Sequence, residues 1–339
     1  MSKKVKISDI AEALGISKNT VSKALNGQYV PEKTRNLVLS KARELNYKSM
    51  MYIDGEVIKN HRILLLSTKP LSNMNYFLPI IQTIENICYE KKYQLFQHVA
   101  LEDEFYSKSF ELYLENVQID GIVVIESFQN KIIKKILDKG IPTVFIDFSV
   151  EHVEHTHPYD VIEPDNFNVI FNYLNKKIQK EKIKDINFIG DHNHCLSFKE
   201  RYLAMHVAIS TNNINHDFSK DLTDIDDSSI YGNPLLLKNE LLRKGLSPFY
   251  ICGNDYIALN LIKALKLMKK NVPNDVQVMG FDNSMESRTL DPKITTINVQ
   301  REHLAKITLD CLIDRINNPN KCTTKVLVNS DLIIRESTK

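Results

Sequence analysis

The stretch that decides the fold at the start of the chain is ISDIAEALGISKNTVSKALNG, residues 7–27. Gly15 ends a first predicted helix, Ile16 is the inward residue of a tight turn, and Ser17 caps a second helix that begins at Lys18. In each half the apolar residues recur at helical spacing: Ile10, Ala11 and Leu14, then Val21, Ala24 and Leu25. Two short helices joined by about three residues that include a glycine form a helix-turn-helix unit.

A third helix is predicted in VPEKTRNLVLSKARELNY, residues 30–47. Pro31 suits the first turn of a helix, and Val38, Ala42 and Leu45 line its inner face. The three helices together predict a small all-helical domain at the start of the chain.

Charge separates this domain from the rest of the chain. Residues 1–48 contain ten Lys and Arg against four Asp and Glu, a net charge of +6, whereas the whole chain carries only +2. A basic domain on a mildly acidic body indicates that the basic domain binds a polyanion.

The polar face of the second helix is the predicted contact with that polyanion. In a helix-turn-helix unit this face projects outward, where it can enter the major groove of DNA. Lys18, Asn19 and Lys23 carry groups that pair with base edges. The shorter hydroxyl and amide side chains suit phosphate oxygens: Ser17, Thr20, Ser22 and Asn26. The alternative is a face that only meets solvent.

The remaining composition is that of a soluble, cytoplasmic protein. Hydrophobic residues make up 43% and charged residues 25% of the 339 residues, a length that predicts more than one domain. The five cysteines are scattered without a Cys-x-x-Cys pair, which is typical of buried free thiols in a reducing compartment. No apolar run is long enough for a membrane span, and the N-terminus lacks a signal-peptide core.

From residue 62 onward, short apolar runs alternate with amphipathic stretches such as residues 75–92 and 255–270. This alternation predicts parallel sheets covered by helices on both faces, and the series is long enough for two sheets. The predicted strands are RILLLS (62–67), YQLFQHV (93–99), DGIVVIE (120–126), PTVFID (142–147), DINFIG (185–190), PFYICG (248–253) and VQVMGFD (276–282).

Polar residues follow these predicted strands. Ligands of doubly wound folds bind beyond the carboxyl ends of the strands, so these positions predict the lining of a cleft between two lobes. Each alone is as well explained as a helix cap or turn former. They are Ser67, Thr68, Glu126, Asp147, Gly190, Asp191, His192, Asn254, Asp255, Asp282 and Asn283.

The sequence VKISDIAEALGISKNTVSKALNG, residues 5–27, resembles the N-terminal signature of the lactose/galactose repressor (LacI/GalR) family of bacterial transcription regulators. The resemblance extends through residues 34–47 and across nearly the whole chain. It implies that Lys18, Asn19 and Lys23 occupy the base-reading positions of the recognition helix. It also implies that Tyr29 lies near a loop that contacts the DNA backbone.

The linker departs from the family pattern. Family members usually carry Pro, Asn and a hinge helix whose leucine wedges into the minor groove, but this chain has Ser49 at the proline position and Gly55 within the expected helix. Glu56 stands where the wedge leucine is expected, and a carboxylate there meets a strongly negative groove. We therefore expect little kinking of the operator, unless Met50, Met51 or Ile53 takes the place of the wedge.

The body also resembles the family. SNMNYFLPIIQTIE (72–85), VFIDF (144–148) and SFKERYLAMHVAI (197–209) are similar to its effector-binding segments, and ICGNDYIALNLIKALK (251–266) and VQVMGFDN (276–283) to its C-terminal signatures. Asp, Asn and Arg bind hydroxyl pairs, and an aromatic face covers an apolar ring surface. By resemblance the effector contacts are Tyr76, Phe77, Asp147, Arg201, Asn254, Asp255 and Asp282, of which the aromatic pair is equally typical of a core.

Histidines in two segments have the side chains of metal ligands but not their spacing. Neither a His-x3-His helix pair nor a Cys-x-x-Cys knuckle accompanies them, so the prediction is polar loops at the cleft mouth, with no metal and no cofactor. These residues are His152, His155, His157, His192, His194 and Cys195.

The sequence and the resemblance together predict an all-α head and an α/β body of two doubly wound parallel-sheet lobes, like a periplasmic binding protein. The expected domains are residues 1–48, a linker at 49–61 and an effector-binding, dimerising body at 62–339. Within the body, one lobe is expected to comprise 62–163 and 297–321, and the other 164–296 and 322–339.

The predicted function is transcriptional repression by a homodimer. A small molecule controls the affinity of the homodimer for operator DNA, and a sugar is the expected effector. Three alternatives remain open: a regulator that responds to a nucleobase or phosphosugar, a cytoplasmic carbohydrate sensor with weakened operator binding, and an enzyme that uses Asp147 and Asp282 as an acid/base pair. The basic helical head and the lack of a phosphate-binding loop or nucleophile motif argue against the enzyme.

Overall fold

The structure is a computed structural model that divides into two compact units. One unit comprises residues 1–63 and 88–95, and the other comprises residues 64–87 and 96–339. The residues that the structure describes are 5–25, 29–45, 47, 50–53, 56–59, 61–67, 76–100, 108–125, 130–148, 157–193, 195–223 and 228–339.

The head contains the three helices that the sequence predicts: α1 (Ile7–Leu14), α2 (Lys18–Leu25) and α3 (Glu32–Glu44). Gly15 ends α1 in the left-handed conformation at φ 65°, which a residue without a side chain adopts at little cost. The predicted inner faces meet in one core of Ile10, Ala11, Val21, Ala24, Leu25, Val30, Val38 and Ala42, with Ile16 half-buried against it.

The linker segment contains a β-hairpin. Strands β1 (Met50–Ile53) and β2 (Glu56–Lys59) pair antiparallel, with Ile53 opposite Glu56. Two residues, Asp54 and Gly55, separate the strands in the sequence, and Asp-Gly is a strong signal for a two-residue hairpin turn. The described part of the segment is therefore strand, not the hinge helix of the family pattern.

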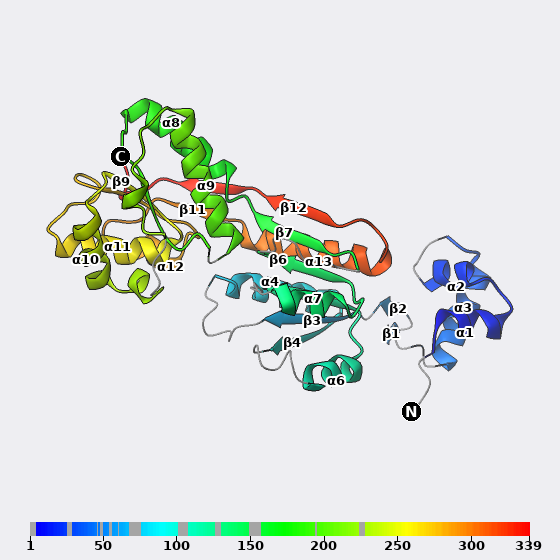
Figure 1. Ribbon diagram of the computed structural model, residues 1–339. Helices are drawn as coiled ribbons and strands as arrows, with labels where there is room; N and C mark the ends of the chain where they lie inside the picture. Colours follow the sequence, from blue (N-terminus) through cyan, green and yellow to red (C-terminus); the bar gives the residue numbers. More distant parts are fainter. Residues whose placement is uncertain are drawn as a thin grey trace. The chain divides into compact units, whose positions relative to one another are not determined.

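The larger sheet of the body has six strands in the order β12-β7-β6-β5-β3-β4 (Figure 1). The pairs β5·β6, β6·β7 and β7·β12 are parallel. The strands are β3 (Arg62–Ser67), β4 (Gln94–Val99), β5 (Gly121–Ile125), β6 (Thr143–Ile146), β7 (Asp160–Pro164) and β12 (Thr324–Val328).

Helices cover this sheet on its two faces. Apolar residues of α6 (Lys108–Val117) and α7 (Asn130–Leu137) form one core with β3, β5 and β6, while α13 (Arg301–Asn317) packs against β5, β6 and β7. Helix α4 (Leu78–Glu90) follows β3 in the chain. The sheet is thus a doubly wound layer, as the alternating sequence pattern predicts.

A buried ion pair joins α13 to the sheet. The guanidinium of Arg315 donates to both carboxylate oxygens of Asp160, at 2.8 and 2.6 Å, and both side chains are fully buried. Burial raises the pKa of Asp160, but the hydrogen bonds from Arg315 and Lys321 outweigh that effect and lower it overall. A buried carboxylate without its partner is costly, so this ion pair holds the last turn of α13 against the start of β7.

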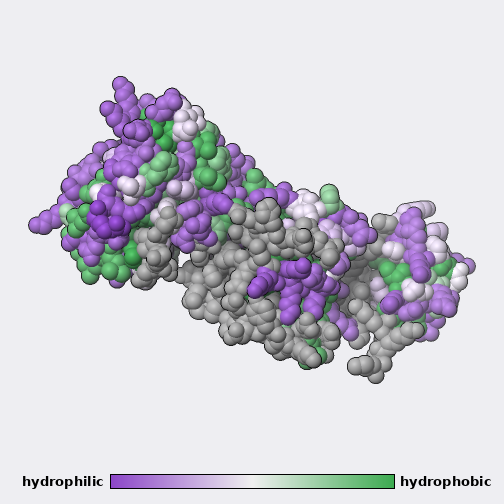
Figure 2. Space-filling view, viewed as in Figure 1, coloured by the Kyte–Doolittle hydropathy of each residue, from purple (hydrophilic) through white to green (hydrophobic). Residues whose placement is uncertain are grey.

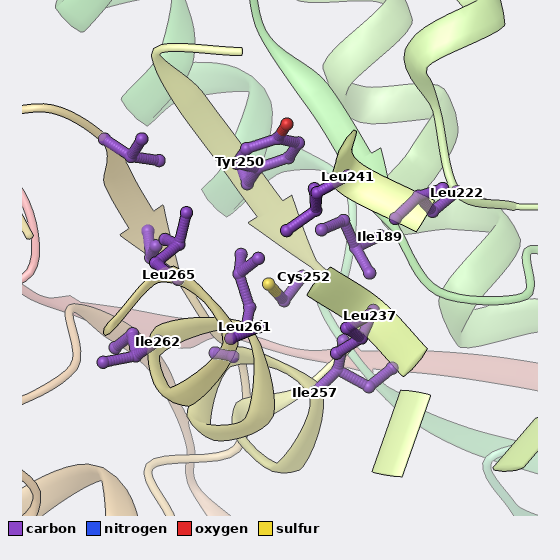
Figure 3. Close-up of a cluster of buried hydrophobic side chains, with 14 of the residues drawn as sticks. Ile189, Leu222, Leu237, Leu241, Tyr250, Cys252, Ile257, Leu261, Ile262 and Leu265 are labelled. Atoms are coloured by element: carbon purple, nitrogen blue, oxygen red, sulfur yellow. The ribbon is translucent and has the colours of Figure 1, made fainter. Parts of the chain in front are cut away.

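The second sheet has the order β10-β9-β8 with parallel pairing. Its strands are β8 (Asn187–Ile189), β9 (Phe249–Cys252) and β10 (Gln277–Met279). Helices α10 (Pro234–Lys244) and α11 (Asp255–Leu267) pack on it around the core that includes Ile189, Tyr250 and Leu261 (Figure 3). Helices α8 (Asn168–Glu181) and α9 (Leu196–Thr211) pack against each other.

Shorter elements complete this part of the chain. Strands β11 (Thr296–Val299) and β13 (Ser330–Ile333) pair antiparallel. Single-turn helices among the described residues are η2 (Phe218–Lys220), η3 (Ser228–Gly232) and α12 (Met285–Thr289).

All seven strands predicted from apolar runs are confirmed, and the described part of the body contains four strands that the sequence analysis does not predict: β7, β11, β12 and β13. Strand β7 has charged residues at two buried positions, Asp160 and Glu163, each paired with a cation from elsewhere, so it is not an apolar run. Strand β12 lies in the larger sheet, although the sequence prediction assigned residues 322–339 to the second lobe. Its alternating exposure is typical of an edge strand, which an apolar-run criterion does not detect.

Among the described residues, no helix is both long and apolar enough to cross a membrane. Hydrophilic side chains cover most of the visible surface of the second sheet and its helices, with smaller apolar areas between them (Figure 2). Of the five cysteines, three are buried as predicted, whereas Cys311 is half-buried and Cys322 is exposed.

Candidate functional site

Helix α2 presents a polar face above the core of the head. Its apolar residues are buried in that core, while Lys18, Asn19 and Lys23 are exposed. Thr20 and Ser22 are half-buried at the edge of the same face. The three residues predicted to read bases are therefore the three most accessible polar side chains of α2, as entry into a DNA groove requires.

Ser17 and Tyr29 flank this helix. The Ser17 hydroxyl accepts a hydrogen bond from the backbone N–H of Thr20 at 3.0 Å, so it caps α2 as predicted. Tyr29 exposes 92% of its surface, which leaves its whole ring available to a partner. Asn26, the remaining predicted DNA contact, lies outside the described residues.

A second candidate site lies in the body, where charged side chains from separate elements come together. We call Tyr76, Asp147, Arg201, Asp282 and Arg301 the carboxylate-arginine cluster. Both aspartates and both arginines perturb the Tyr76 hydroxyl electrostatically, and Asp147 and both arginines also perturb Asp282. Asp147 follows β6 directly and Asp282 comes three residues after β10, so both lie beyond carboxyl ends of parallel strands.

Arg201 is buried on α9 and is held rigidly. Its Nη1 donates to the carbonyl of Gly253 at 2.6 Å, and its Nε donates to the side-chain oxygen of Asn166 at 3.1 Å. The guanidinium carbon lies 3.5 Å from the ring centroid of Phe281, a close cation-π contact. Contacts from three separate segments of the chain thus orient this arginine.

The two aspartates of the cluster adopt backbone conformations that non-glycine residues rarely adopt. Asp147 has φ 55° and Asp282 has φ 109°. Such conformations are concentrated at functional sites, because the surrounding structure must compensate for their cost. Asp147 Oδ1 accepts a hydrogen bond from the Ser197 hydroxyl of α9. Burial raises the pKa of Asp282 to about 7.

The two aromatic residues just before α4, Tyr76 and Phe77, have different surroundings. Phe77 is buried at 5% exposure and belongs to the interior. The Tyr76 hydroxyl is buried without a hydrogen-bond partner among the described residues, and the Arg301 guanidinium carbon lies 5.9 Å from its ring centroid. Burial, with Asp147 and Asp282, raises the pKa of Tyr76 well above its usual value.

The side chains of Asn254 and Asp255 are hydrogen-bonded to other groups of the protein. The Asn254 side chain caps α11 by accepting from the N–H of Ile257 at 3.0 Å. The buried Asp255 carboxylate accepts from the Thr296 hydroxyl at 2.6 Å and from the N–H of Ser284 at 2.7 Å. A Cβ at Gly280 would lie 2.2 Å from Asp255 Oδ1, so the carboxylate is packed directly against the strand end.

The sequence reasoning missed two polar residues of this site, Ser197 and Arg301. Ser197 lies four residues before Arg201, one helical turn away on the same face of α9, and that spacing is a signal in the sequence. Arg301 opens α13, far from the other members in sequence, and no local pattern connects it with them.

The histidines of the sequence analysis do not form one group in the described part of the chain. His157 is exposed, and the His192 ring stacks on Tyr202 at 4.8 Å between centroids. Burial raises the pKa of the Cys195 thiol to about 12. His152, His155 and His194 lie outside the described residues, as do Thr68 and Glu126.

A surface cavity of about 570 Å³ lies between α8, β13 and the C-terminus. Three lysines of α8, Lys176, Lys177 and Lys180, line it, and none of the residues of the carboxylate-arginine cluster does. This cavity is therefore separate from the predicted effector site.

Two family profiles match the chain. Residues 6–49 match bacterial regulatory proteins of the lacI family, and residues 178–338 match the periplasmic binding protein-like domain. Among curated proteins, the HTH-type transcriptional repressor PurR of Pasteurella multocida is 28% identical over 341 residues, covering 98% of both chains. The PurR repressor of Pectobacterium carotovorum is also 28% identical, covering 98% of this chain and 96% of its own.

Solved structures share the fold at lower identity. The complex of the transcriptional regulator CelR with cellobiose superposes with a TM-score of 0.70 at 20% identity, covering 98% of this chain and 99% of its own. The lac repressor dimer bound to operator and the anti-inducer ONPF gives 0.67 at 20% identity and 99% coverage of both chains. A LacI family regulator of Enterococcus faecium with bound ribose gives 0.66 at 21% identity, covering 82% of this chain and 98% of its own.

Proposed function

Because the chain belongs to the lacI family of bacterial regulatory proteins, we propose that it represses transcription by binding an operator through α2, under the control of a small molecule bound in its body. The observation that carries the proposal is the exposed face of Lys18, Asn19 and Lys23 on a helix whose other face is buried. Lys pairs with guanine O6 and N7, and Asn pairs with adenine N6 and N7, so this face has the chemistry to read sequence.

The effector that fits the carboxylate-arginine cluster best is a neutral polyol, and we propose a sugar. The cluster combines two carboxylates with two guanidinium groups, so its formal charges balance. Carboxylates accept and guanidinium groups donate, and this combination binds vicinal hydroxyl pairs. Two of the structural relatives were solved with sugars, cellobiose and ribose. Nucleobases and phosphosugars are the alternative effector class.

The proposal also covers the place of the effector, the assembly of the protein and the form of the operator. The effector lies between two lobes of the body, and the protein acts as a cytoplasmic homodimer without catalysis. A two-fold dimer presents two copies of α2 to half-sites about one helical turn apart, so the operator is a near-palindrome. The effector changes operator affinity by the difference between its affinities for the DNA-binding and released states.

The DNA-binding part of the proposal is tested by gel shifts of the full chain on the DNA upstream of its own gene and on random DNA. Lys18→Ala and Asn19→Ala should each cost roughly 1–3 kcal/mol on the specific site and relax its sequence preference. Binding to random DNA should be nearly unchanged, because phosphate contacts elsewhere on the head supply it.

Lys41→Ala is the matched control for charge. Lys41 lies on α3, pairs with Glu44 at 2.6 Å and is not part of the exposed face of α2. It should leave specific binding unchanged. Equal losses on specific and random DNA for Lys18→Ala would contradict base reading by this face, and no specific binding at all by the native chain would contradict operator binding.

The effector is identified by a thermal-shift screen of the full chain against sugars, sugar phosphates and purines. A ligand present at 100 times its dissociation constant adds about 2.7 kcal/mol to the free energy of unfolding. A hit among free sugars supports the polyol, whereas hits confined to purines or to sugar phosphates would replace it with the alternative class.

A further inference from the structure

Three potential metal ligands converge in the body, outside both sites described above. His206 lies on α9, His216 lies in the loop that follows α9, and Asp221 directly follows η2. One ligand atom from each lies within 4.8 Å of the other two. The sequence does not reveal this group, since it has neither a His-x3-His helix pair nor clustered cysteines.

The geometry centres on one carboxylate oxygen. Asp221 Oδ2 lies 3.0 Å from His216 Nε2 and 3.9 Å from His206 Nε2. Ligand atoms around a tetrahedral ion with bonds of 2.0–2.1 Å are about 3.3 Å apart. Small side-chain movements therefore bring all three atoms to coordination distance.

The hydrogen bond between His216 and Asp221 explains the proximity of these two residues but leaves His206 without a partner in the group. His206 Nε2 is buried and has no hydrogen-bond partner among the described residues, although it points at the same carboxylate oxygen from 3.9 Å. A buried ring nitrogen without a partner loses its hydration and gains nothing in return. A cation between the three groups would provide the missing partner.

We propose that His206, His216 and Asp221 form a binding site for Zn²⁺. Two imidazole nitrogens and one carboxylate oxygen are a typical ligand set for this ion, and water completes the tetrahedron as the fourth ligand. His216 binds the ion through Nε2 as the neutral tautomer protonated on Nδ1, so the single ring proton moves from Nε2, where it bonds Asp221 Oδ2, to Nδ1.

Neighbouring groups hold these ligands in place. Asp221 Oδ1 accepts from the Phe188 N–H at 2.8 Å and from Asn187 Nδ2 at 2.9 Å, so the carboxylate is anchored to β8 and its other oxygen faces the histidines. The Phe218 ring stacks on the His206 ring at 5.0 Å and 4°. Such outer contacts orient ligands and are typical of metal sites.

An ion at this position would link several segments of the body. It would connect α9, the loop that follows it and β8, and α9 is also the helix that carries Ser197 and Arg201. A bound ion would therefore stabilise the helix that positions the predicted effector arginine. This inference does not rest on the proposed function, because it concerns binding of the metal alone.

The test is a titration of the full, untagged chain, stripped of metal with a chelator, with Zn²⁺ by calorimetry and with Co²⁺ by visible absorption. We expect one ion per chain and the intense absorption of four-coordinate Co²⁺, together with a higher melting temperature in Zn²⁺. His206→Gln and His216→Gln should each weaken the affinity at least 100-fold and abolish the Co²⁺ band.

Two controls separate this site from other histidines. His303→Gln removes an exposed histidine of α13 and should leave the titration unchanged. The triple variant His152→Gln, His155→Gln, His157→Gln removes the closely spaced histidines of residues 152–157 and should also leave the titration unchanged. The proposal is overturned if the native chain binds no stoichiometric ion, if folded His206→Gln binds as tightly as the native chain, or if this triple variant abolishes binding.

Discussion

Asp282 shows how a single side chain of the body connects local backbone, electrostatics and function. Its backbone is held at φ 109°, and burial raises the pKa of its carboxyl to about 7, with Arg201 opposing and Asp255 and Asp147 adding to the rise. A carboxyl that titrates near neutrality without an adjacent catalytic nucleophile motif is consistent with ligand binding. Its environment also makes the stability of the protein depend on pH.

The Asp282→Asn variant should remove that dependence. The pKa of Asp282 is higher in the folded chain than its value of 3.8 in an unfolded chain, so the folded state binds the extra proton. Its stabilising contribution is complete below about pH 4 and is lost as the pH rises to about 7. Relative to Asp282→Asn, the free energy of unfolding of the native chain should fall by about 1.4 kcal/mol per pH unit within this window.

Urea denaturation of both proteins between pH 5 and pH 8 measures this difference. The exposed Asp310 of α13 supplies the control, since Asp310→Asn should follow the native pH profile closely. Parallel profiles for the native chain and Asp282→Asn would show that the carboxyl is ionised throughout and that the assigned shift is wrong.

At the scale of elements, the linker hairpin has a signal in its local sequence, whereas the packing of the end of α13 has none. The hairpin β1·β2 has its signal in the Asp54-Gly55 pair, whereas the family pattern alone makes Gly55 a weak position in a helix. The end of α13 depends on Arg315 and Asp160, which are far apart in sequence, so no local pattern contains it.

A hairpin in the linker segment predicts an operator without a sharp central kink. The wedge of the family requires a helix, and two paired strands present side chains with a different period. In circular-permutation gel shifts, the full chain should therefore bend its operator little. Gly55→Ala should not tighten binding, whereas a hinge helix would gain about 1 kcal/mol from that substitution.

Glu56→Leu is the companion variant, because it restores leucine at the position where the family carries the wedge. If the hairpin persists on DNA, this variant should bend the operator no more than the native chain does. Tighter binding by Gly55→Ala, together with a strong bend in Glu56→Leu, would instead indicate a helix that forms on the operator.

At the scale of the whole molecule, the predicted DNA contacts and the predicted effector contacts fall in different compact units. Helix α2 lies in the unit of residues 1–63 and 88–95, and the carboxylate-arginine cluster lies in the other. Variants of the cluster should therefore change the response to the effector without changing operator binding in its absence. This separation makes the two halves of the proposed function testable independently.

Tyr76→Phe is the sharpest variant for this purpose. The Tyr76 hydroxyl is buried with no hydrogen-bond partner among the described residues, so its removal should not lower the free energy of unfolding. If a ligand provides the missing partner, the variant should bind effector about 1–3 kcal/mol more weakly. Effector titrations of the operator complex would then shift to roughly 5- to 150-fold higher concentrations, with unchanged affinity for DNA alone.

Phe77→Leu is the control, because this neighbouring residue is buried in the core and is not part of the cluster. It should lower the melting temperature while leaving the midpoint of the effector titration in place. An unchanged midpoint for Tyr76→Phe would remove the hydroxyl from the effector site.

The sequence by itself determined the three helices of the head, the exposed face of α2, and the seven apolar strands that define the α/β body. These features depend on periodicity and on cap or turn residues, and such signals extend over only a few positions. Which residues bind an effector remains a prediction. The sequence also indicates that the predicted residues lie at strand ends, because parallel strands bring their carboxyl ends to one edge of the sheet.

Only the tertiary structure decided which polar residues meet one another. It gave Asp255 hydrogen bonds from Thr296 and Ser284, and it brought Arg301 to the ring of Tyr76. It also paired Asp160 with Arg315 across 155 residues and brought His206, His216 and Asp221 together. The physical reason is that hydrogen bonds and ion pairs act over a few ångströms in space, whereas sequence patterns record only neighbours along the chain.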